Sequence, residues 1–459
     1  MKVLLISANT VRVPYCIYPI GLDYVAGSLS PRHEVKIADV NIVSGTAAIG
    51  ELIDGFGPDI VGLSLRNIDN TDAMDAKGFI RAYRELTDAV REHTAAPVVL
   101  GGSGFTIFPR QLMDALGADY GIIGEGERLD QLLDAIEEGR DPSELEGVIM
   151  KHAPEPSPRP LESIPPRRFN PGGHDRFYIA RGGMLNLQSK RGCEYNCVYC
   201  TYPRIEGSDF RLIPPEEVAA TALELERAGA KYFFITDSVF NGNYGHSLEV
   251  ARAFAKQGLS IPWGAFFAPT RPPDGYYEEL RGAGLTHVEF GTEALSDRML
   301  AALRKPFNAR DVYVAHEAAC GASLYIAHYL LLGGPGENRN TVVETIENAK
   351  RLEKCVIFFF CGIRIYPHTA LYDIALAEGQ ISASDDLLEP VFYQSRDIDS
   401  AEIYRMVSEE GAGRENWFVG SGGRRSARLV ARLHKQGQTG PLWEQIGRAS
   451  CRERVYHPV

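Results

Sequence analysis

Short apolar runs alternate with helical patterns of apolar and polar positions over the first 150 residues. Runs of this kind are typical of buried strands, and the segments between them are typical of helices. The predicted strands are Lys2–Ala8, His33–Asp39, Ile60–Leu65, Pro97–Gly101 and Tyr120–Ile123. The predicted helices are Ile20–Leu29, Gly45–Phe56, Met74–His93, Pro109–Leu116 and Glu127–Glu138. This order predicts a doubly wound α/β domain over residues 1–150, with helices on both faces of a parallel sheet.

A different pattern follows, because seven prolines interrupt residues 151–171. They predict a stiff linker over residues 151–178. The alternation then resumes with predicted strands at Met184–Gln188, Lys231–Thr236, Pro262–Phe267, His287–Phe290, Ser323–Leu332 and Val356–Ile365, separated by helices. Six such units over residues 179–400 are two short of a complete eight-fold barrel. They predict a partial (βα)6 barrel with its chemistry at the carboxyl ends of the strands.

Residues 401–459 form a separate C-terminal segment that becomes rich in glycine and arginine from Gly420 onward. Its last stretch, 445–455, looks like a translated sequencing adapter. We therefore expect this end to be artefactual and the native C-terminus to be missing. The alternative is a solvated basic tail.

Composition narrows the class of protein. The 459 residues carry a formal charge of −12, which argues against a protein that coats nucleic acid. The sequence contains no apolar run near the roughly 20 residues of a membrane span, and its first residues are typical of a strand rather than a signal peptide. We expect a cytoplasmic protein whose cysteines stay reduced.

Polar residues and glycines follow the predicted strands of the first domain, at the edge where doubly wound domains bind ligands. Glycine there lets the backbone approach a ligand closely, although tight turns would also explain it. The candidate ligand-binding residues are Asn9, Thr10, Ser64, Arg66, Gly101, Gly102, Gly124 and Glu125.

Three of the eight cysteines, Cys193, Cys197 and Cys200, fall within eight residues after the first strand of the second half. A structural zinc site would need a fourth cysteine or histidine, and no such pair stands nearby. A disulfide would leave one thiol over, and three buried thiols would be an improbable coincidence. An iron-sulfur cluster bound by three thiolates, with one iron left open, fits this spacing best.

This spacing, with the aromatic Tyr199 before the last cysteine, resembles the signature of the radical S-adenosylmethionine (SAM) enzymes. The resemblance implies a 4Fe-4S cluster on the three cysteines whose open iron binds SAM. Reductive cleavage of SAM then gives a 5′-deoxyadenosyl radical, which removes a hydrogen atom from substrate.

Other strand ends of the barrel are similar to the same family. The resemblance assigns the methionine amine of SAM to Asp237 and Ser238, although the family's usual Gly-Gly-Glu is missing there and Asp237 could simply cap a helix. It assigns the ribose to Glu293 and places adenine against Gly333 and Gly334. Lys305 also matches a common family position, although a solvated lysine is an equal alternative.

The first domain resembles the cobalamin-binding domain that one branch of this family carries. The similar segments are residues 19–26, 58–64, 98–102 and 124–127. Many cobalamin domains supply a histidine to cobalt, but the only histidines before residue 150 are His33 and His93, which lie away from the predicted ligand edge. Cobalamin would therefore bind without a histidine from this domain, unless the domain is only a scaffold.

The resemblance predicts an enzyme that uses cobalamin to transfer a methyl group to a carbon of a small molecule, with a flavodoxin or ferredoxin as electron donor. It predicts no nucleic-acid partner. Radical cyclisation, rearrangement or oxidation without methyl transfer is the main alternative. A methylthiotransferase would want three more cysteines in the first domain, where only Cys16 is present. A non-catalytic protein with zinc on the cysteine loop is a further alternative.

Overall fold

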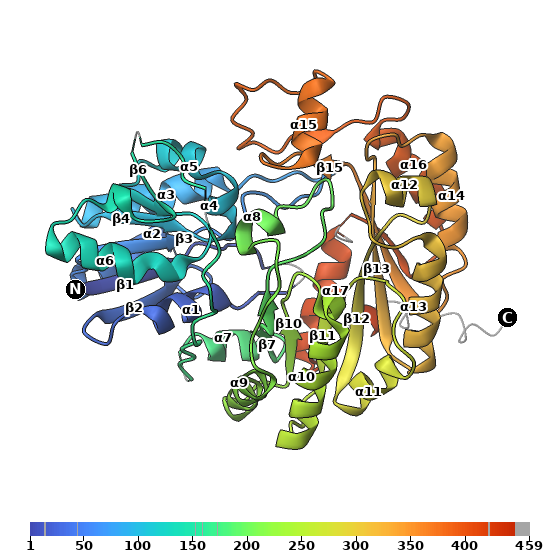
Figure 1. Ribbon diagram of the computed structural model, residues 1–459, viewed down its shortest axis with the longest axis horizontal. Coiled ribbons are helices and arrows are strands. Elements are labelled where there is room, and N and C mark those ends of the chain that lie inside the picture. Colours follow the sequence, from blue (N-terminus) through green and yellow to red (C-terminus); the bar gives the residue numbers. More distant parts are fainter. Residues whose placement is uncertain are drawn as a thin grey trace.

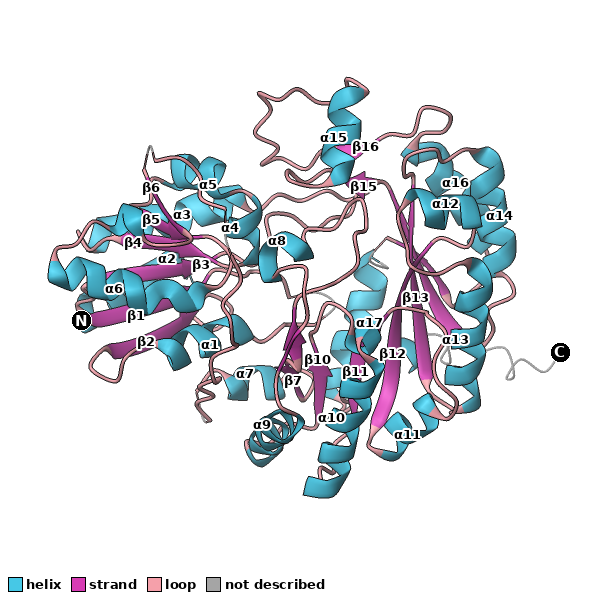
Figure 2. Cartoon of the chain, viewed as in Figure 1, coloured by secondary structure: helices cyan, strands magenta, loops and turns pink. Residues whose placement is uncertain are grey.

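A computed structural model describes residues 1–12, 15–43, 45–151, 153–157, 159–171, 173–420 and 423–445, without the side chains of 423–426. Two α/β domains lie side by side, and each consists of a sheet flanked by helices (Figures 1 and 2). The doubly wound domain and the partial parallel barrel predicted from the sequence are confirmed.

Among the described residues, six strands form the sheet of the first domain. Their spatial order is β2 (Glu34–Asp39), β1 (Lys2–Ser7), β3 (Ile60–Ser64), β4 (Val98–Gly101), β5 (Tyr120–Ile122) and β6 (Val148–Met150). All neighbours pair in parallel except β5 and β6. Since β1 lies inside the sheet, its residues Val3, Leu4, Leu5 and Ile6 are buried on both faces.

Helices cover both faces of this sheet. One face packs against α1 (Ile20–Ser28) and α6 (Leu129–Glu138), the other against α2 (Gly45–Phe56), α3 (Ile80–His93) and α5 (Pro109–Leu116). Two elements differ from the prediction. Helix α3 starts six residues later than Met74, because residues 66–79 form a loop closed by a bridge between Asp69 and Gly78. A short helix, α4 (Ser103–Ile107), follows β4 directly.

The second sheet is parallel throughout and contains seven strands in the described residues. Their order is β7 (Met184–Leu187), β10 (Tyr232–Ile235), β11 (Trp263–Phe267), β12 (Leu285–Glu293), β13 (Tyr325–Leu332), β14 (Cys355–Cys361) and β17 (Trp417–Val419). Helices α9 (Pro215–Arg227), α10 (Tyr244–Gln257), α11 (Tyr276–Gly282), α12 (Asp297–Ala302), α13 (Ala309–Gly321), α14 (Arg339–Ala349) and α16 (Ser400–Gly411) connect these strands.

The sixth predicted strand was too long at its end. Strand β14 stops at Cys361 because Gly362, at φ 110°, turns the chain. The next residues form β15 (Ile363–Arg364), which pairs with β16 (Phe392–Tyr393), and α15 (Ala370–Ala377) lies between them. A second small ribbon pairs β8 (Lys190–Arg191) with β9 (Arg211–Leu212), and α8 (Tyr202–Glu206) lies between its strands.

The described part of the C-terminal segment packs against the barrel. Its helix α17 (Gly423–Lys435) buries Val430, and Leu442 and Trp443 beyond it are buried against Phe358 of β14. The adapter-like stretch beyond Gln445 lies outside the described residues. Helix α7 (Asp175–Ile179) ends the proline-rich linker.

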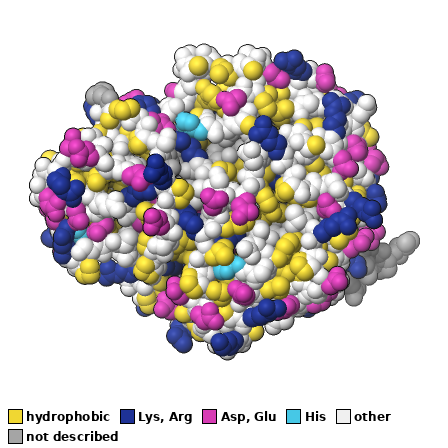
Figure 3. Space-filling model, viewed as in Figure 1, with side chains coloured by type: hydrophobic (Ala, Val, Ile, Leu, Met, Phe, Trp, Pro, Cys, Tyr) yellow, Lys and Arg dark blue, Asp and Glu magenta, His cyan; other side chains and the backbone are white. Residues whose placement is uncertain are grey.

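Acidic and basic side chains are interspersed on the face that Figure 3 shows, so this face carries no large patch of one sign. No helix in the described part of the chain is long and apolar enough to cross a bilayer.

Candidate active site

The three clustered cysteines lie on the loop after β8, which backbone contacts hold in place. Cys193 N–H donates to the carbonyl oxygen of Gly207 over 3.1 Å, and Val198 N–H donates to that of Leu303 over 3.2 Å. Gly192 precedes the first cysteine at φ 90°, and a Cβ there would lie 2.0 Å from the carbonyl oxygen of Asp209. Only glycine fits this close approach, so the loop conformation depends on it.

The thiols of this loop influence one another electrostatically. Burial raises the pKa of Cys200 to about 12, and the nearby charges of Cys197 and Cys193 add to the effect. Burial likewise raises the pKa of Cys197, which Lys305 partly offsets. The raised pKa values of Cys197 and Cys200 favour the neutral thiols, so thiolates at these two positions require a bound positive group.

The separation of the thiols favours a cluster over a single ion. Among the described residues, the sets of ligand atoms that all lie within 4.8 Å of one another occur elsewhere in the chain. At least one pair of the Cys193, Cys197 and Cys200 sulfurs therefore lies more than 4.8 Å apart, which is wider than one tetrahedral ion would hold them. Three spaced thiolates with no fourth cysteine fit a 4Fe-4S cluster with one open iron.

Glu293 lies beside this loop, at the end of β12, where the register with β13 shifts and its φ is 56°. Its Oε1 accepts a hydrogen bond from Tyr199 over 2.5 Å, and Lys305 Nζ lies 3.2 Å from its Oε2. Burial acts to lower the pKa of Lys305, but the charges of Glu293 and Cys197 outweigh it and raise the pKa above its ordinary value. The ammonium group therefore stays charged between the carboxylate and the cysteine loop.

The other barrel residues predicted to bind SAM, unlike Glu293, either contact other protein groups or lie outside the cavities. The Asp237 carboxylate is buried, and it accepts hydrogen bonds from the backbone and hydroxyl of Ser189 and forms an ion pair with Lys190 Nζ at 3.1 Å. Its lone pairs are used within the barrel, so it is not available to a ligand in this geometry. Ser238 donates to the carbonyl oxygen of Gly192 over 2.8 Å and so supports the cysteine loop. Gly333 and Gly334 line neither of the two cavities described next.

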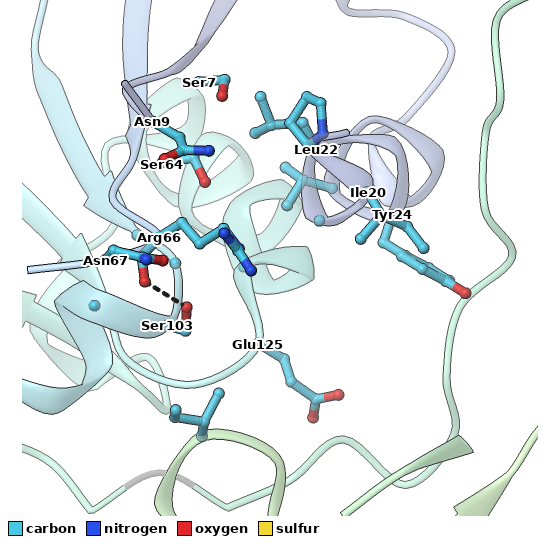
Figure 4. Close-up of a pocket in the computed structure, with 18 of the residues that line it drawn as sticks. Ser7, Asn9, Ile20, Leu22, Tyr24, Ser64, Arg66, Asn67, Ser103 and Glu125 are labelled. Carbon is cyan, nitrogen blue, oxygen red and sulfur yellow. Dashed lines mark hydrogen bonds between the residues drawn. The ribbon is translucent and has the colours of Figure 1, made fainter. Parts of the chain in front are cut away.

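A cavity of about 460 Å³ opens at the carboxyl ends of β1, β3, β4 and β5 and extends between the sheet and α1. Figure 4 shows side chains from these elements around it, including Ser64, Arg66 and Tyr24. Of the ligand-binding residues predicted in the first domain, the following line this cavity: Asn9, Ser64, Arg66, Gly101, Gly102, Gly124 and Glu125. Thr10 does not line it.

The Arg66 side chain extends into the cavity toward α1 (Figure 4). No described residue forms an ion pair or hydrogen bond with the Arg66 guanidinium. The backbone of Arg66 is held separately, because the Ser103 hydroxyl donates to the Arg66 carbonyl oxygen over 2.8 Å. The surrounding protein desolvates the guanidinium and lowers its pKa. The side chain is nevertheless exposed at the cavity, so its guanidinium is free to contact a bound polar or anionic group.

Glu125 is instead the centre of an interdomain ion-pair cluster. Its carboxylate accepts from Arg191 over 2.6 Å and from Arg211 over 2.9 Å, both from the barrel side. Arg191 also pairs with Glu127 over 2.6 Å. Glu125 thus lines the cavity at the domain junction, where its charge is already compensated.

Sequence reasoning missed the residues that the barrel contributes to this cavity, among them Tyr202 and Glu206 of α8. Burial raises the pKa of Glu206 to about 7, although Arg191 and the Gly192 N–H act in the opposite direction. No sequence signal pointed to this helix, because it is short and follows the cysteines directly.

A second cavity, of about 220 Å³, lies on the other side of the cysteine loop. Its lining includes Tyr199, Glu293, Tyr329, Phe360 and Arg364 from the barrel. Thr71 and Tyr366 line both this cavity and the first one. The two cavities are therefore neighbours on either side of Thr71 and Tyr366, close to the loop that carries the three cysteines.

Family models match both halves of the chain. The B12 binding domain model matches residues 6–133, and the radical SAM superfamily model matches residues 187–349. An uncharacterized methyltransferase of Pyrococcus horikoshii is 28% identical over 372 residues, which cover 78% of each chain. A tryptophan 2-C-methyltransferase of Streptomyces laurentii is 24% identical over 442 residues, which cover 80% of this chain and 73% of the relative.

Solved structures share the whole fold. The radical SAM methyltransferase TsrM of Kitasatospora setae has been solved with cobalamin and a [4Fe-4S] cluster, and with tryptophan and a SAM analogue. The structure with tryptophan matches at a TM-score of 0.85 and 21% identity over 99% of both chains. The cobalamin-dependent radical enzyme OxsB matches at 0.76 and 14% identity over 99% of this chain and 71% of that one. The chain therefore belongs to the radical SAM enzymes that carry an amino-terminal B12-binding domain.

Proposed function

We propose that this protein is a cobalamin-dependent methyltransferase that binds SAM at a 4Fe-4S cluster and acts on a small molecule. The observation that carries this proposal is that the two cavities are neighbours, sharing Thr71 and Tyr366 in their linings close to the cysteine loop. A methyl transfer that uses two cofactors requires both to reach one substrate. The methyltransferase names of the relatives from Pyrococcus horikoshii and Streptomyces laurentii support the same reaction class.

The chain's own residues would hold the cluster and the SAM. Cys193, Cys197 and Cys200 supply three thiolates, and Lys305 compensates part of their negative charge. Glu293 faces the second cavity beside Tyr199, where its carboxylate can accept hydrogen bonds from a polar group of SAM. The cluster supplies an electron to SAM, and cobalamin carries methyl groups.

The first cavity would hold part of a bound cobalamin, since the whole cofactor is larger than about 460 Å³. Its walls combine the apolar side of β1, β3 and β4 with glycines at the ends of β4 and β5. Arg66 places a positive charge in this space, and the described residues offer the cavity no histidine ligand for cobalt. The residues thus fit a cobalamin whose cobalt takes no histidine from this domain.

The second cavity would hold the substrate next to the group of SAM that Glu293 contacts. At about 220 Å³ it suits a small molecule, and Tyr199, Tyr329, Phe360 and Tyr366 give it aromatic walls. Tyr329 stacks on Phe358 with ring centres 5.0 Å apart, so this wall is rigid. A planar aromatic substrate fits such walls, and the tryptophan bound in the TsrM structure is of this class.

The test starts from anaerobically purified protein reconstituted with iron, sulfide and cobalamin. We expect about four irons per chain, one cobalamin, and reductant-dependent formation of 5′-deoxyadenosine, with a flavodoxin or ferredoxin as donor. Aromatic amines and amino acids are then screened with methyl-labelled SAM. Labelled product supports methyl transfer.

The alternative reactions give different results. A product that forms without the label would favour radical cyclisation, rearrangement or oxidation. Zinc without iron on the cysteine loop would contradict an enzyme of this class. Cys197→Ala should abolish iron binding, whereas Cys361→Ser, which changes a buried thiol outside the loop, should retain it.

A further inference from the structure

A buried cluster of nitrogen and sulfur ligands lies on the outer side of the barrel sheet, away from the cysteine loop. It comprises His316 of α13, His328 of β13 and Cys355, the first residue of β14. Helix α13 covers this part of the sheet in Figure 1. One candidate ligand atom from each side chain lies within 4.8 Å of the other two.

The three side chains are almost inaccessible to solvent. His328 is fully buried, and His316 and Cys355 are 5% and 6% exposed. Burial lowers the pKa of both histidines, so both rings are neutral near pH 7 and each carries a lone pair. Neutral imidazole and thiolate are the ligands preferred by zinc and other borderline-soft cations.

The spacing of the two rings suits a shared ion. His316 Nδ1 and His328 Nε2 are 3.0 Å apart. Two zinc–nitrogen bonds of about 2.0–2.1 Å each can therefore reach one ion from these atoms. The Cys355 thiol now donates to the carbonyl oxygen of Leu352 over 3.5 Å, and burial raises its pKa. Coordination would replace that weak bond and release the thiol proton to solvent.

Outer contacts hold both rings in the orientation that coordination needs. Thr292, also fully buried, places its hydroxyl oxygen 2.8 Å from His328 Nδ1, which leaves Nε2 for the ion. Cys320 Sγ lies 3.5 Å from His316 Nε2, which leaves Nδ1 for the ion. Metal-bound histidines characteristically use their second nitrogen in this way.

We propose that His316, His328 and Cys355 form a second metal site, which binds one Zn²⁺ and ties α13 to the barrel sheet. The site is independent of the cluster cysteines and of the proposed methyl transfer. A solvent molecule would complete a four-coordinate ion, since three protein ligands are present. Without metal, the same groups form a hydrogen-bonded chain from Cys320 through both histidines to Thr292.

The test measures zinc in the full chain with its iron-sulfur cluster reconstituted. The protein is incubated with Zn²⁺, desalted and analysed for zinc and iron. We expect about one zinc per chain in addition to the cluster iron. His328→Gln and Cys355→Ser should each lower zinc retention at least tenfold, while unchanged cluster iron shows that they fold. Cys361→Ser, at the other end of β14, is the matched control and should retain zinc.

Two further measurements separate this site from other binding. Replacement of Cys193, Cys197 and Cys200 together by alanine removes the cluster and should leave the zinc in place. X-ray absorption at the zinc edge should show two nitrogen ligands and one sulfur ligand. Failure of the parent protein to retain zinc, equal retention in both ligand variants, or an all-oxygen ligand shell would overturn the proposal.

Discussion

Arg364 and Asp69 form a buried ion pair that joins the barrel to the loop after β3, with Nε donating to Oδ2 over 2.8 Å. The two side chains are 3% and 0% exposed. Arg364 also donates to the carbonyl oxygen of Leu387 over 2.6 Å. Since the loop that carries Asp69 also carries Arg66 and Thr71, this pair fixes one wall of both cavities against the barrel.

Asp69→Asn should strongly destabilise the protein. The change leaves the Arg364 guanidinium buried without its counter-charge, which costs about 3–5 kcal/mol for pairs of this kind. Urea and thermal unfolding of the cofactor-free protein measure the effect. The control is Arg81→Ala, which removes an exposed pair with Glu85 and should cost less than about 1 kcal/mol. Equal stability of the Asp69→Asn and Arg81→Ala proteins would show that the interdomain pair contributes little.

Lys305→Met should make the iron-sulfur cluster harder to reduce. The ammonium group lies between Glu293 and Cys197, so its loss adds one net negative charge beside the cluster. We expect the reduction potential to fall by tens of millivolts, since nearby charge is one determinant of such potentials. A redox titration followed by electron paramagnetic resonance measures it.

Two variants test the electrostatic origin of that shift. Lys305→Arg keeps the charge and should keep the potential close to that of the parent. Lys305→Met combined with Glu293→Gln removes both charges and should recover most of the difference. A potential that falls equally in Lys305→Met and Lys305→Arg would mean that packing, rather than charge, is responsible.

The contribution of Glu206 to stability should decrease as the pH rises from about 4.5 to 7. Burial raises the pKa of this carboxyl to about 7 in the folded chain, against an ordinary value of 4.5. Over this interval the unfolded chain loses the proton while the folded chain keeps it, so the folded state becomes less favourable. The shift corresponds to roughly 3–4 kcal/mol at most. Thermal unfolding of the cofactor-free protein at several pH values measures the slope.

Glu206→Gln should remove that part of the pH dependence. The variant is expected to match the parent near pH 4.5 and to exceed its stability above pH 7, since glutamine needs no proton. Glu217→Gln, on the exposed side of α9, controls for the loss of one carboxylate. A stability gain that is the same at pH 4.5 and pH 8 would contradict a raised pKa at Glu206.

The sequence was sufficient for most strands of both sheets, because buried parallel strands are continuous apolar runs. It missed β6 and β17, which are only three residues long and lie at sheet edges. It also extended α3 back to Met74, since the bridge between Asp69 and Gly78 depends on a loop fold with no periodic signal.

For the candidate site, too, the sequence predicted features that have a local pattern and missed those that depend on the tertiary fold. The cysteine spacing and the glycines at strand ends are local patterns, and the predicted glycines of the first domain do line the first cavity. Whether a carboxylate is free to bind a ligand depends on residues that are distant in the sequence. Asp237 and Glu125 look like ligands in the sequence, but Lys190 and Arg191 from other elements already compensate them. The contribution of α8 to the first cavity depends in the same way on how the two domains meet.

Gly101→Leu should block cobalamin binding without disturbing the fold. The backbone at Gly101 is not in the left-handed region, and a Cβ added there would approach only the carbonyl oxygen of Ile122, at 4.0 Å. A side chain at this position therefore fits the backbone, and because Gly101 lines the first cavity, leucine would fill part of that space. We expect bound cobalamin to fall at least tenfold, as counted by absorbance after desalting, with cluster iron and thermal stability unchanged.

The neighbouring positions show why Gly101 suits this test. Gly102 has φ 96°, and a Cβ there would lie 2.8 Å from the carbonyl oxygen of Leu65, so Gly102→Ala would strain the turn itself. Gly101→Ala adds only one carbon and should retain most of the cobalamin. Full cobalamin binding by Gly101→Leu would place the cofactor outside this cavity. Loss of cobalamin in Gly101→Leu but not in Gly101→Ala would tie binding to the space beside β4.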